Sequence, residues 1–109
     1  MTIYVAGPYT GGDPVINVRN ACLAGEALVA KGHTPVVPHL FHLWHLCSPH
    51  DYEYWLSLDR GLLGLCDALV RLPGVSPGAH REVEWAMGLG LSIFLGVDDV
   101  PYAPGAGGE

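Results

Sequence analysis

Two carboxylates, Asp59 and Glu82, carry the strongest suggestion of chemistry in this sequence. Glu82 lies in "SPGAHREVEWA", residues 76–86, where a Ser-Pro-Gly turn opens a predicted helix. At about 100° per residue, Glu82 falls at the edge of the apolar face, whereas Glu84 lies further round, toward solvent. That face is expected to pack on a sheet through Ala79, Val83, Ala86, Met87 and Gly90. We therefore expect Glu82 to point into a crevice, and the alternative is that it only favours the helix N-terminus electrostatically.

Asp59 occupies a buried position in the preceding predicted helix, residues 51–66. The other positions of its stripe are apolar or aromatic, namely Tyr52, Trp55, Leu56, Leu62, Leu63 and Cys66. A lone carboxylate on such a stripe is costly unless it is partnered or poised for chemistry. The alternative is a structural aspartate satisfied by a loop amide or by Arg60. Two inward carboxylates from successive helices suggest acid/base or nucleophilic work at one site.

Two glycine-containing turns could bind a small ligand. Ser76 and Gly78 offer a hydroxyl and free backbone amides to an anion at the start of a helix, although N-capping alone would also explain the serine. The stretch "GPYTGG", residues 7–12, lacks the GxGxxG spacing of a dinucleotide site and the GK[ST] of a P-loop. It predicts a turn at which the backbone can approach a small ligand.

A run of histidines raises the alternative of a metal site. His39, His42 and His45 recur at every third position, with Cys47 and His50 nearby, and such side chains can converge on a metal. No HExxH motif accompanies them, so packing of amphipathic rings in a loop or interface is favoured. We expect neither a metal nor an organic cofactor.

The elements that must position these residues alternate between short apolar strands and helices. Strands are predicted at residues 2–7, 33–38, 67–72 and 91–97, and helices at 15–31, 51–66 and 78–89, with 39–50 unassigned. Asp13 should cap the first helix and Gly32 should end it. This alternation predicts an α/β domain with a parallel sheet. Its ligand crevice should lie beyond the carboxyl ends of the strands, near residues 6–12 and 72–78.

Composition limits the classes of partner. The chain has 109 residues and a net charge of −6 without a Lys/Arg cluster, which argues for one domain and against a nucleic-acid polymer as partner. Cys22, Cys47 and Cys66 form no CxxC motif and favour a reducing compartment. No signal peptide or transmembrane run is visible, so we expect a cytoplasmic protein that binds no membrane. Half of the residues are apolar, which indicates a subunit interface.

Four stretches together resemble the nucleoside 2-deoxyribosyltransferase-like superfamily. They are "IYVAGPYT", "GHTPVVPH", "LDRGLLGLCDALVRLPG" and "SPGAHREVEWAMGLG", and the likeness covers residues 2–96. The most specific parts are the Asp59/Asp67 spacing and the run Ser-x-Gly-x-x-x-Glu-x-x-x-Ala that begins at Ser76. The resemblance implies a flavodoxin-like, Rossmann-like domain at residues 1–97, with a parallel sheet of four to five strands and helices on both faces. A Pro/Gly-rich tail is assigned to residues 98–109, and its stretch "PYAPGAGGE", residues 101–109, is expected to be loosely ordered.

This superfamily contains deoxyribosyltransferases and nucleoside 5′-monophosphate N-glycosidases, and the resemblance implies a catalytic set. Glu82 would be the nucleophile that attacks the anomeric carbon. Asp59 would handle the leaving base, and Tyr4 would hydrogen-bond the nucleophilic carboxylate. The chemistry agrees with the reading of the helices, because N-glycosidic cleavage passes through an oxocarbenium-like state that a nearby carboxylate stabilises.

The resemblance also implies how the substrate binds. Gly7 and Tyr9 would line the sugar and base pocket, and Ser76 and Gly78 would hold a 5′-phosphate. Deoxyribosyltransferases acting on free nucleosides tend to carry Asp at the position of Ser76, which favours a nucleotide substrate here. Four side chains are candidates for stacking on the base: Tyr9, Leu40, Trp44 and Trp55. A homodimer or higher homo-oligomer is also implied.

The leading interpretation is hydrolysis of the N-glycosidic bond of a (2′-deoxy)ribonucleoside 5′-monophosphate. One alternative is a nucleoside 2-deoxyribosyltransferase that exchanges bases between deoxynucleosides, and another is a non-catalytic nucleotide-binding module on the same fold. The first loop, "GPYTGGD", lacks the arginine found there in some monophosphate hydrolases, and the C-terminal tail is short. These two departures bear on phosphate preference and on the use of an acceptor base.

Overall fold

A four-stranded parallel sheet forms the centre of the computed structural model, which describes residues 1–106. The strands are β1 (Thr2–Ala6), β2 (Thr34–Val36), β3 (Ala68–Arg71) and β4 (Ser92–Phe94). Their order in the sheet is β2-β1-β3-β4, which is the flavodoxin-like order. The four parallel strands confirm the predicted sheet, and each is shorter than predicted.

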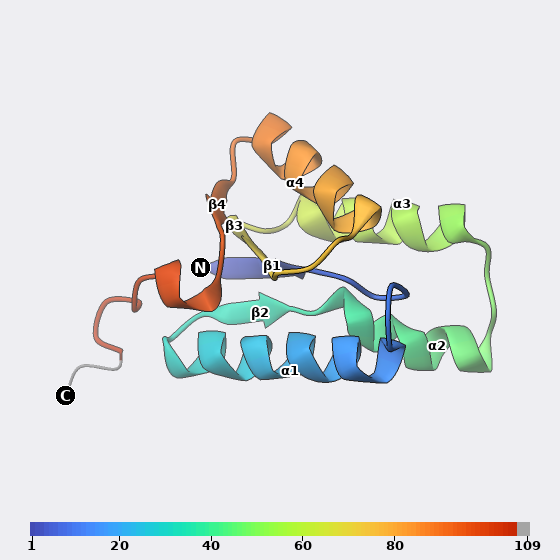
Figure 1. The fold of residues 1–109 in the computed structure, drawn as a ribbon. Coiled ribbons are helices and arrows are strands. Elements are labelled where there is room, and N and C mark those ends of the chain that lie inside the picture. The colour runs from blue at the N-terminus through green and yellow to red at the C-terminus, as the bar shows by residue number, and fades with distance from the viewer. Residues whose placement is uncertain (107–109) are drawn as a thin grey trace.

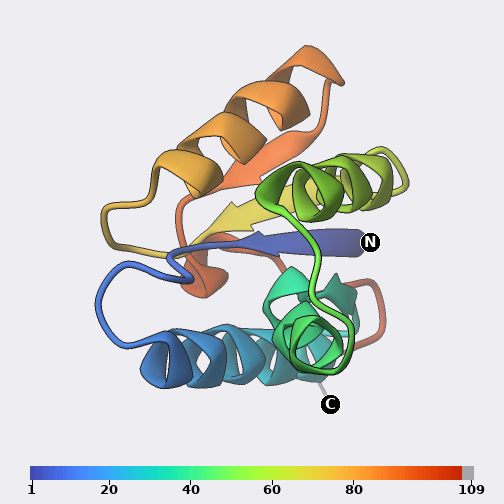
Figure 2. The same cartoon turned by 90° about the vertical axis from the view of Figure 1, so that its right-hand side faces the viewer.

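The helices cover both faces of this sheet, as predicted. They are α1 (Pro14–Ala30), α2 (Phe41–Cys47), α3 (Tyr52–Leu63) and α4 (Pro77–Gly88), with 3-10 turns η1 (Pro38–Leu40) and η2 (Val97–Asp99). Helix α1 lies on one side of the sheet, and α3 and α4 lie on the other (Figures 1 and 2). The segment that the sequence left unassigned forms η1 and α2. No helix within residues 1–106 has the length and apolar character needed to cross a bilayer.

Alternation along β1 and β3 divides the core into two layers. One layer, against α1, contains Ile3, Val5, Ala21, Ala24, Leu28, Ala68, Val70 and Val100. The other, against α3 and α4, contains Tyr4, Ala6, Leu63, Cys66, Leu69, Ala79 and Ala86. Tyr4 therefore points toward the same two helices that carry the predicted carboxylates.

The ends of α1 are as predicted. The side chain of Asp13 accepts a hydrogen bond from the Val15 amide at 2.9 Å, and Pro14 stands in the first turn. At the other end, Gly32 has a φ of +88°, a left-handed conformation that favours glycine. These two residues fix the length of the helix that follows the β1 loop.

The apolar faces of α3 and α4 differ from the prediction at their ends. Met87 is 64% exposed and Gly90 is exposed, because α4 ends at Gly88 and the chain turns back so that the Leu91 amide bonds to the Ala86 carbonyl. Tyr52 is 58% exposed because the first turn of α3 projects beyond the carboxyl ends of the strands (Figure 1). Both faces are buried only where the sheet lies beneath them.

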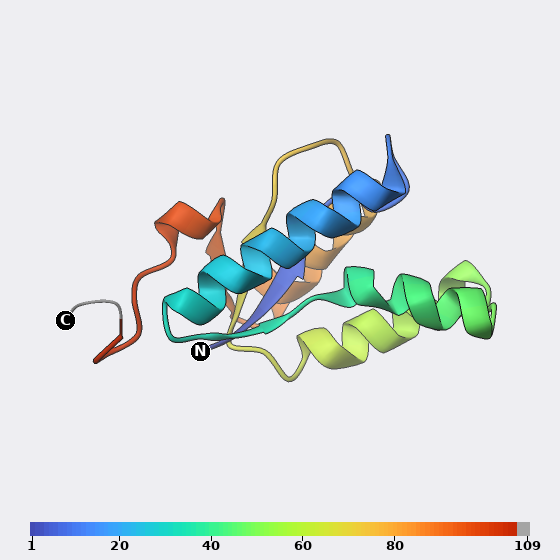
Figure 3. The ribbon, with the colours of Figure 1, turned by 90° about the horizontal axis from the view of Figure 1, so that it is seen from below.

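The expectation of a loosely ordered tail is wrong for residues 101–106, where the Pro101 carbonyl bonds to His33 at 2.7 Å, and the residues just before them are packed as well. Val100 is 2% exposed and packs in the α1 layer. The Lys31 ammonium donates to the carbonyls of Val97 at 2.8 Å and Val100 at 2.7 Å, and the Ala103 amide donates to the Lys31 carbonyl. The segment from η2 onward thus lies beside the C-terminal end of α1 (Figures 1 and 3). The rest of the predicted tail, residues 107–109, lies outside the described residues, and the domain boundary at 97 stays a prediction.

This packing predicts a stability difference between two valines. Val100→Ala should lower the free energy of unfolding by about 2 kcal/mol, because it removes two buried methyl groups and leaves a cavity. Val15→Ala, at an exposed position of α1, should change it by less than about 0.5 kcal/mol. Urea denaturation of both variants measures the difference. Equal effects would contradict an ordered 98–106 segment.

Candidate active site

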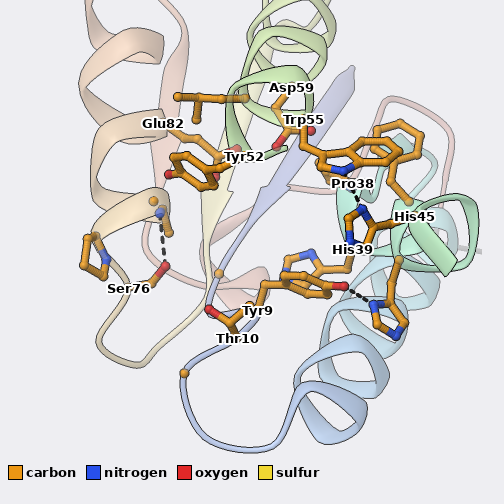
Figure 4. Close-up of a pocket in the computed structure, with 18 of the residues that line it drawn as sticks. Tyr9, Thr10, Pro38, His39, His45, Tyr52, Trp55, Asp59, Ser76 and Glu82 are labelled. Carbon is orange, nitrogen blue, oxygen red and sulfur yellow. Dashed lines mark hydrogen bonds between the residues drawn. The ribbon is translucent and has the colours of Figure 1, made fainter. Parts of the chain in front are cut away.

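A pocket of about 660 Å³ lies beyond the carboxyl ends of β1 and β3. The strand order reverses between these two strands, and such a switch point is where ligands bind in open α/β sheets. The walls come from the loop after β1, from η1 and α2, from α3, and from the start of α4 (Figure 4). The pocket therefore stands where the alternation of elements placed the crevice.

The predicted site residues are brought together in this pocket. Those that line it are Gly7, Tyr9, Asp59, Ser76, Gly78 and Glu82. Tyr4 is fully buried next to it, and its hydroxyl donates a hydrogen bond to Oε2 of Glu82. The contact between Tyr4 and Glu82 joins the central strand to α4.

The two glutamates of α4 have the different surroundings that the helical wheel predicted. Glu82 is half-buried and lines the pocket. Glu84 is exposed, and its carboxylate lies 3.4 Å from Nε2 of His80 at the surface. The position of Glu82 in the second turn places its side chain over the sheet, whereas Glu84 is turned away from it.

Asp59 lacks the partners that a structural role would require. Its Oδ1 atom is buried and accepts no hydrogen bond within residues 1–106. The guanidinium of Arg60 lies instead over the ring of Trp85, 4.9 Å from its centre. A buried carboxylate oxygen without a donor is costly, and the residue that carries this oxygen lines a cavity large enough for a ligand.

Burial raises the proton affinity of both carboxylates. Desolvation, together with the negative charge of Glu82, raises the pKa of Asp59 to about 7. Desolvation also raises the pKa of Glu82 to about 7, although the hydrogen bond from Tyr4 and the charge of Arg71 act in the opposite direction. The pKa of the Tyr4 hydroxyl is raised, chiefly by burial, so this hydroxyl stays a donor.

These surroundings distinguish the two acids. Tyr4 and Arg71 both favour the charged form of Glu82, whereas among residues 1–106 no donor or cation favours the charged form of Asp59. When the pair holds one proton, it is therefore expected to reside on Asp59. Such a pair consists of a carboxylate and a neutral carboxylic acid, which are the two components of glycosidic bond cleavage.

Ser76 and Gly78 form the pocket wall at the start of α4. The hydroxyl oxygen of Ser76 accepts a hydrogen bond from the Ala79 amide at 3.1 Å, so the serine is the N-cap of α4. This leaves the hydroxyl hydrogen available to an acceptor in the pocket. The Gly78 amide belongs to the first turn, where no intrahelical carbonyl can accept from it. Together these groups can donate to an anion.

The opposite wall consists of imidazole and aromatic rings (Figure 4). The indole N–H of Trp55 donates to Nδ1 of His45 at 2.9 Å, and the Tyr9 hydroxyl bonds to Nδ1 of His42. Because an indole can only donate, the proton of neutral His45 is on Nε2. These contacts hold the rings in place as a surface against which a flat ligand group can pack.

His39 belongs to the same wall and is buried. Its Nε2 donates to the Pro8 carbonyl at 3.0 Å, whereas its Nδ1 has no partner within residues 1–106. Burial lowers the pKa of His39, which favours a neutral ring with a free acceptor at Nδ1. Of the predicted stacking residues, Tyr9 and Trp55 line the pocket, but Leu40 and Trp44 do not. In residues 1–106, no three His, Cys, Asp or Glu side chains are grouped so as to hold a metal.

Sequence reasoning missed two contributors to the site. The helical part of the wall was missed because residues 39–50 had no assignment, although the three-residue spacing of the histidines is compatible with one helical face. Arg71 was missed because it ends an apolar strand. Arg71 is two positions after Leu69, and side chains two positions apart in a strand point to the same face. The strand pattern would therefore have placed Arg71 on the same face of the sheet as Tyr4.

Comparisons with known proteins agree with this fold. A model of the family described as "Domain of unknown function (DUF7768)" matches residues 1–95. A comparison with curated proteins gave no match. Among solved structures, a 2-deoxyribosyltransferase from the psychrotolerant bacterium Bacillus psychrosaccharolyticus has a TM-score of 0.63 and 18% identity, over 85% of this chain and 69% of that one.

A second solved structure, the "2-desoxiribosyltransferase" from Leishmania mexicana, has a TM-score of 0.62 and 19% identity. The match covers 84% of this chain and 61% of that chain. At these identities the likeness is one of fold, and it confirms the predicted resemblance to nucleoside 2-deoxyribosyltransferases at that level.

The raised proton affinity of Asp59 predicts a pH-dependent cost to stability. In the unfolded chain this carboxyl titrates near pH 4, and in the folded protein near 7. Between these two pKa values, the folded state therefore holds a proton on Asp59 that the unfolded chain has lost. The free energy of unfolding falls as the pH rises from the lower value to the higher one. Asp59→Asn should be more stable than the unmodified protein by on the order of 2 kcal/mol at pH 8 and not at pH 4.5.

Urea denaturation at both pH values measures this difference. Glu84→Gln is the matched control, because Glu84 is an exposed carboxylate, and its stability should follow that of the unmodified protein at both pH values. A stability gain in Asp59→Asn that is the same at pH 4.5 and pH 8 would show that the Asp59 carboxyl is not held protonated.

Proposed function

We propose that this chain, which belongs to the family described as "Domain of unknown function (DUF7768)", hydrolyses the N-glycosidic bond of (2′-deoxy)ribonucleoside 5′-monophosphates. The observation that carries the proposal is the pair Asp59 and Glu82, which share one buried pocket and have different hydrogen-bond surroundings. The fold it shares with two 2-deoxyribosyltransferases supports a nucleoside-type ligand.

Glu82 is the nucleophile in this proposal. Its carboxylate attacks the anomeric carbon, and the bond from that carbon to the base nitrogen breaks with its electron pair on the base. The intermediate is a sugar ester of Glu82. The Tyr4 hydroxyl holds Oε2 and leaves the other oxygen free to reach the sugar. Because Tyr4 is fully buried, this hydrogen bond orients the carboxylate before the ligand enters.

Asp59 supplies the proton that the leaving base needs. A neutral carboxyl with a pKa of about 7 can donate near neutral pH, whereas an ordinary aspartate is already ionised there. In the second step, the Asp59 carboxylate takes a proton from water, and the water oxygen displaces Glu82 from the sugar. This step releases the sugar phosphate, and the proton returns Asp59 to its starting state.

The two ends of the pocket suggest how the substrate lies. Ser76 lies on one side, and His45 and Trp55 lie on the other, with Asp59 and Glu82 between them along the rim (Figure 4). A 5′-phosphate at Ser76 would place the sugar near Glu82 and the base against Trp55.

Base exchange is the second candidate, because both similar structures are named 2-deoxyribosyltransferases. A transferase would use the same first step, and a second base would replace water in the second step. The expected homo-oligomer and cytoplasmic location stay predictions from the sequence.

A substrate panel tests these functions. The protein is incubated with dGMP, dCMP, CMP and deoxyadenosine, each with and without a second base, and base release is followed. Release from a monophosphate without an acceptor supports the hydrolase. Exchange that occurs only with an acceptor supports the transferase, and binding without turnover would contradict both.

The two glutamates of α4 should differ in their effect on turnover. Glu82→Ala and the closer isostere Glu82→Gln should lower kcat by roughly a thousandfold or more, because both remove the nucleophile. Glu84→Ala should leave kcat within about threefold, because that side chain pairs with His80 at the surface. Steady-state rates on the best monophosphate measure this. Equal losses at positions 82 and 84 would contradict the assignment of Glu82.

Ser76 should act on phosphate rather than on the nucleoside. Ser76→Ala should raise KM for the monophosphate by roughly tenfold, the loss expected for a hydrogen bond to a charged group, with KM for the matching nucleoside little changed. The variant should also lose about 1 kcal/mol of stability, because it removes an N-cap. A uniform change for both substrates would reduce Ser76 to its capping role.

A further inference from the structure

Arg71 lies on the same face of the sheet as the candidate catalytic residues. It is the last residue of β3, two positions after Leu69, which belongs to the core layer against α3 and α4. Across the sheet it pairs with Ala6, and Leu69 pairs with Tyr4. Side chains two positions apart in a strand point to the same face. Arg71 therefore lies on the same face of the sheet as Tyr4, two residues nearer to the carboxyl ends of the strands.

Within residues 1–106, the side-chain hydrogen bonds of Arg71 go to the loop that leads into α4. One guanidinium nitrogen donates to the Leu72 carbonyl and another to the Gly74 carbonyl at 2.8 Å. Gly74 has a φ of +116°, and a Cβ there would stand 2.7 Å from Pro8, in the loop after β1. The loop is thus held between Arg71 and the β1 loop, two residues before Ser76.

The charge of Arg71 is not neutralised by these contacts. Both acceptors are neutral carbonyls, and within residues 1–106 no carboxylate lies within ion-pair distance of Arg71. The residue is half-buried, so its charge is screened less than that of a surface arginine. A cation in this position acts on charges that develop in the neighbouring pocket.

We propose that Arg71 is a positioning residue that fixes the Ser76 loop against the end of β3 and favours the charged form of the Glu82 carboxylate. Its consequence for turnover rests on the proposed function, whereas its effect on the ionisation of Glu82 does not.

The other charged and titratable groups near Glu82 do not replace this charge. Tyr4 from β1 is a neutral donor, and Asp59 from α3 is an acid that competes for the same proton. Tyr52, also from α3, is bound by exposed Arg81 at 3.5 Å. On α4 itself, His80 and Glu84 pair with each other at the surface. The charge of Arg71 lowers the pKa of Glu82 and partly offsets the effect of burial.

Two substitutions separate the charge from the loop contacts. Arg71→Gln removes the positive charge, whereas Arg71→Lys keeps it but cannot bridge two carbonyls with a planar fork. Arg19→Gln is the matched control, because Arg19 is an exposed arginine of α1, on the opposite side of the sheet. All three variants retain Glu82, Asp59 and Tyr4.

The test is the titration of the Glu82 side-chain carboxyl, followed by carbon NMR in the protein without substrate. We expect the midpoint to rise by about one pH unit in Arg71→Gln and to stay within about 0.3 unit in Arg71→Lys and Arg19→Gln. In Arg71→Lys, the ratio of KM for the monophosphate to KM for the nucleoside should rise at least fivefold, because the Ser76 loop has lost its anchor.

An unchanged Glu82 midpoint in Arg71→Gln would overturn the charge role, and an unchanged KM ratio in Arg71→Lys would overturn the loop role. If Arg71→Gln does not fold, Arg71→Met is the second variant that removes the charge, and an unchanged Glu82 midpoint in that variant overturns the charge role. The titration needs no turnover, so absent glycosidase activity with a shifted midpoint would reject the proposed function and leave this inference intact.

Discussion

The rest of this structure depends on the burial of two carboxylates at one pocket, where only one of them has a side-chain donor. Tyr4 stabilises the charge of Glu82, whereas within residues 1–106 no donor reaches Oδ1 of Asp59. The pocket therefore favours one proton for two acids, at a cost in folding free energy that the core elsewhere must offset. Such an arrangement is unfavourable for stability and suited to chemistry in which one acid attacks while the other donates.

The sheet topology creates this arrangement. Because the strand order reverses between β1 and β3, the loops after both strands open around one crevice. The α3/α4 layer covers the face onto which Tyr4 and Arg71 project, and each of its helices brings one acid to the rim. Helix α2 closes the far side with His42, which bonds to Tyr9, and with His45, which accepts a hydrogen bond from Trp55 of α3. Every wall of the pocket is thus tied to an element that also builds the core.

The fold and the two acids could be predicted because both follow from the pattern of apolar residues along the chain. The short apolar runs at residues 2–7 and 67–72 identified strands, and an acid on an apolar stripe identified Asp59. The histidine wall could not be predicted in this way, since α2 is seven residues long, has no buried residue and no side-chain cap. The order of residues 98–106 depends on Lys31 reaching carbonyls far along the chain, which no local pattern reveals.

The most direct measurement of the central claim is the identity of the residue that becomes bonded to the sugar. A nucleotide with fluorine at C2 of the sugar slows both steps by destabilising the oxocarbenium-like state, and with a good leaving base it should leave a sugar phosphate on the enzyme. Peptide mass spectrometry after quenching should locate this group on Glu82, with none in Glu82→Gln. A label on another residue, or base release that persists in Glu82→Gln, would contradict the account.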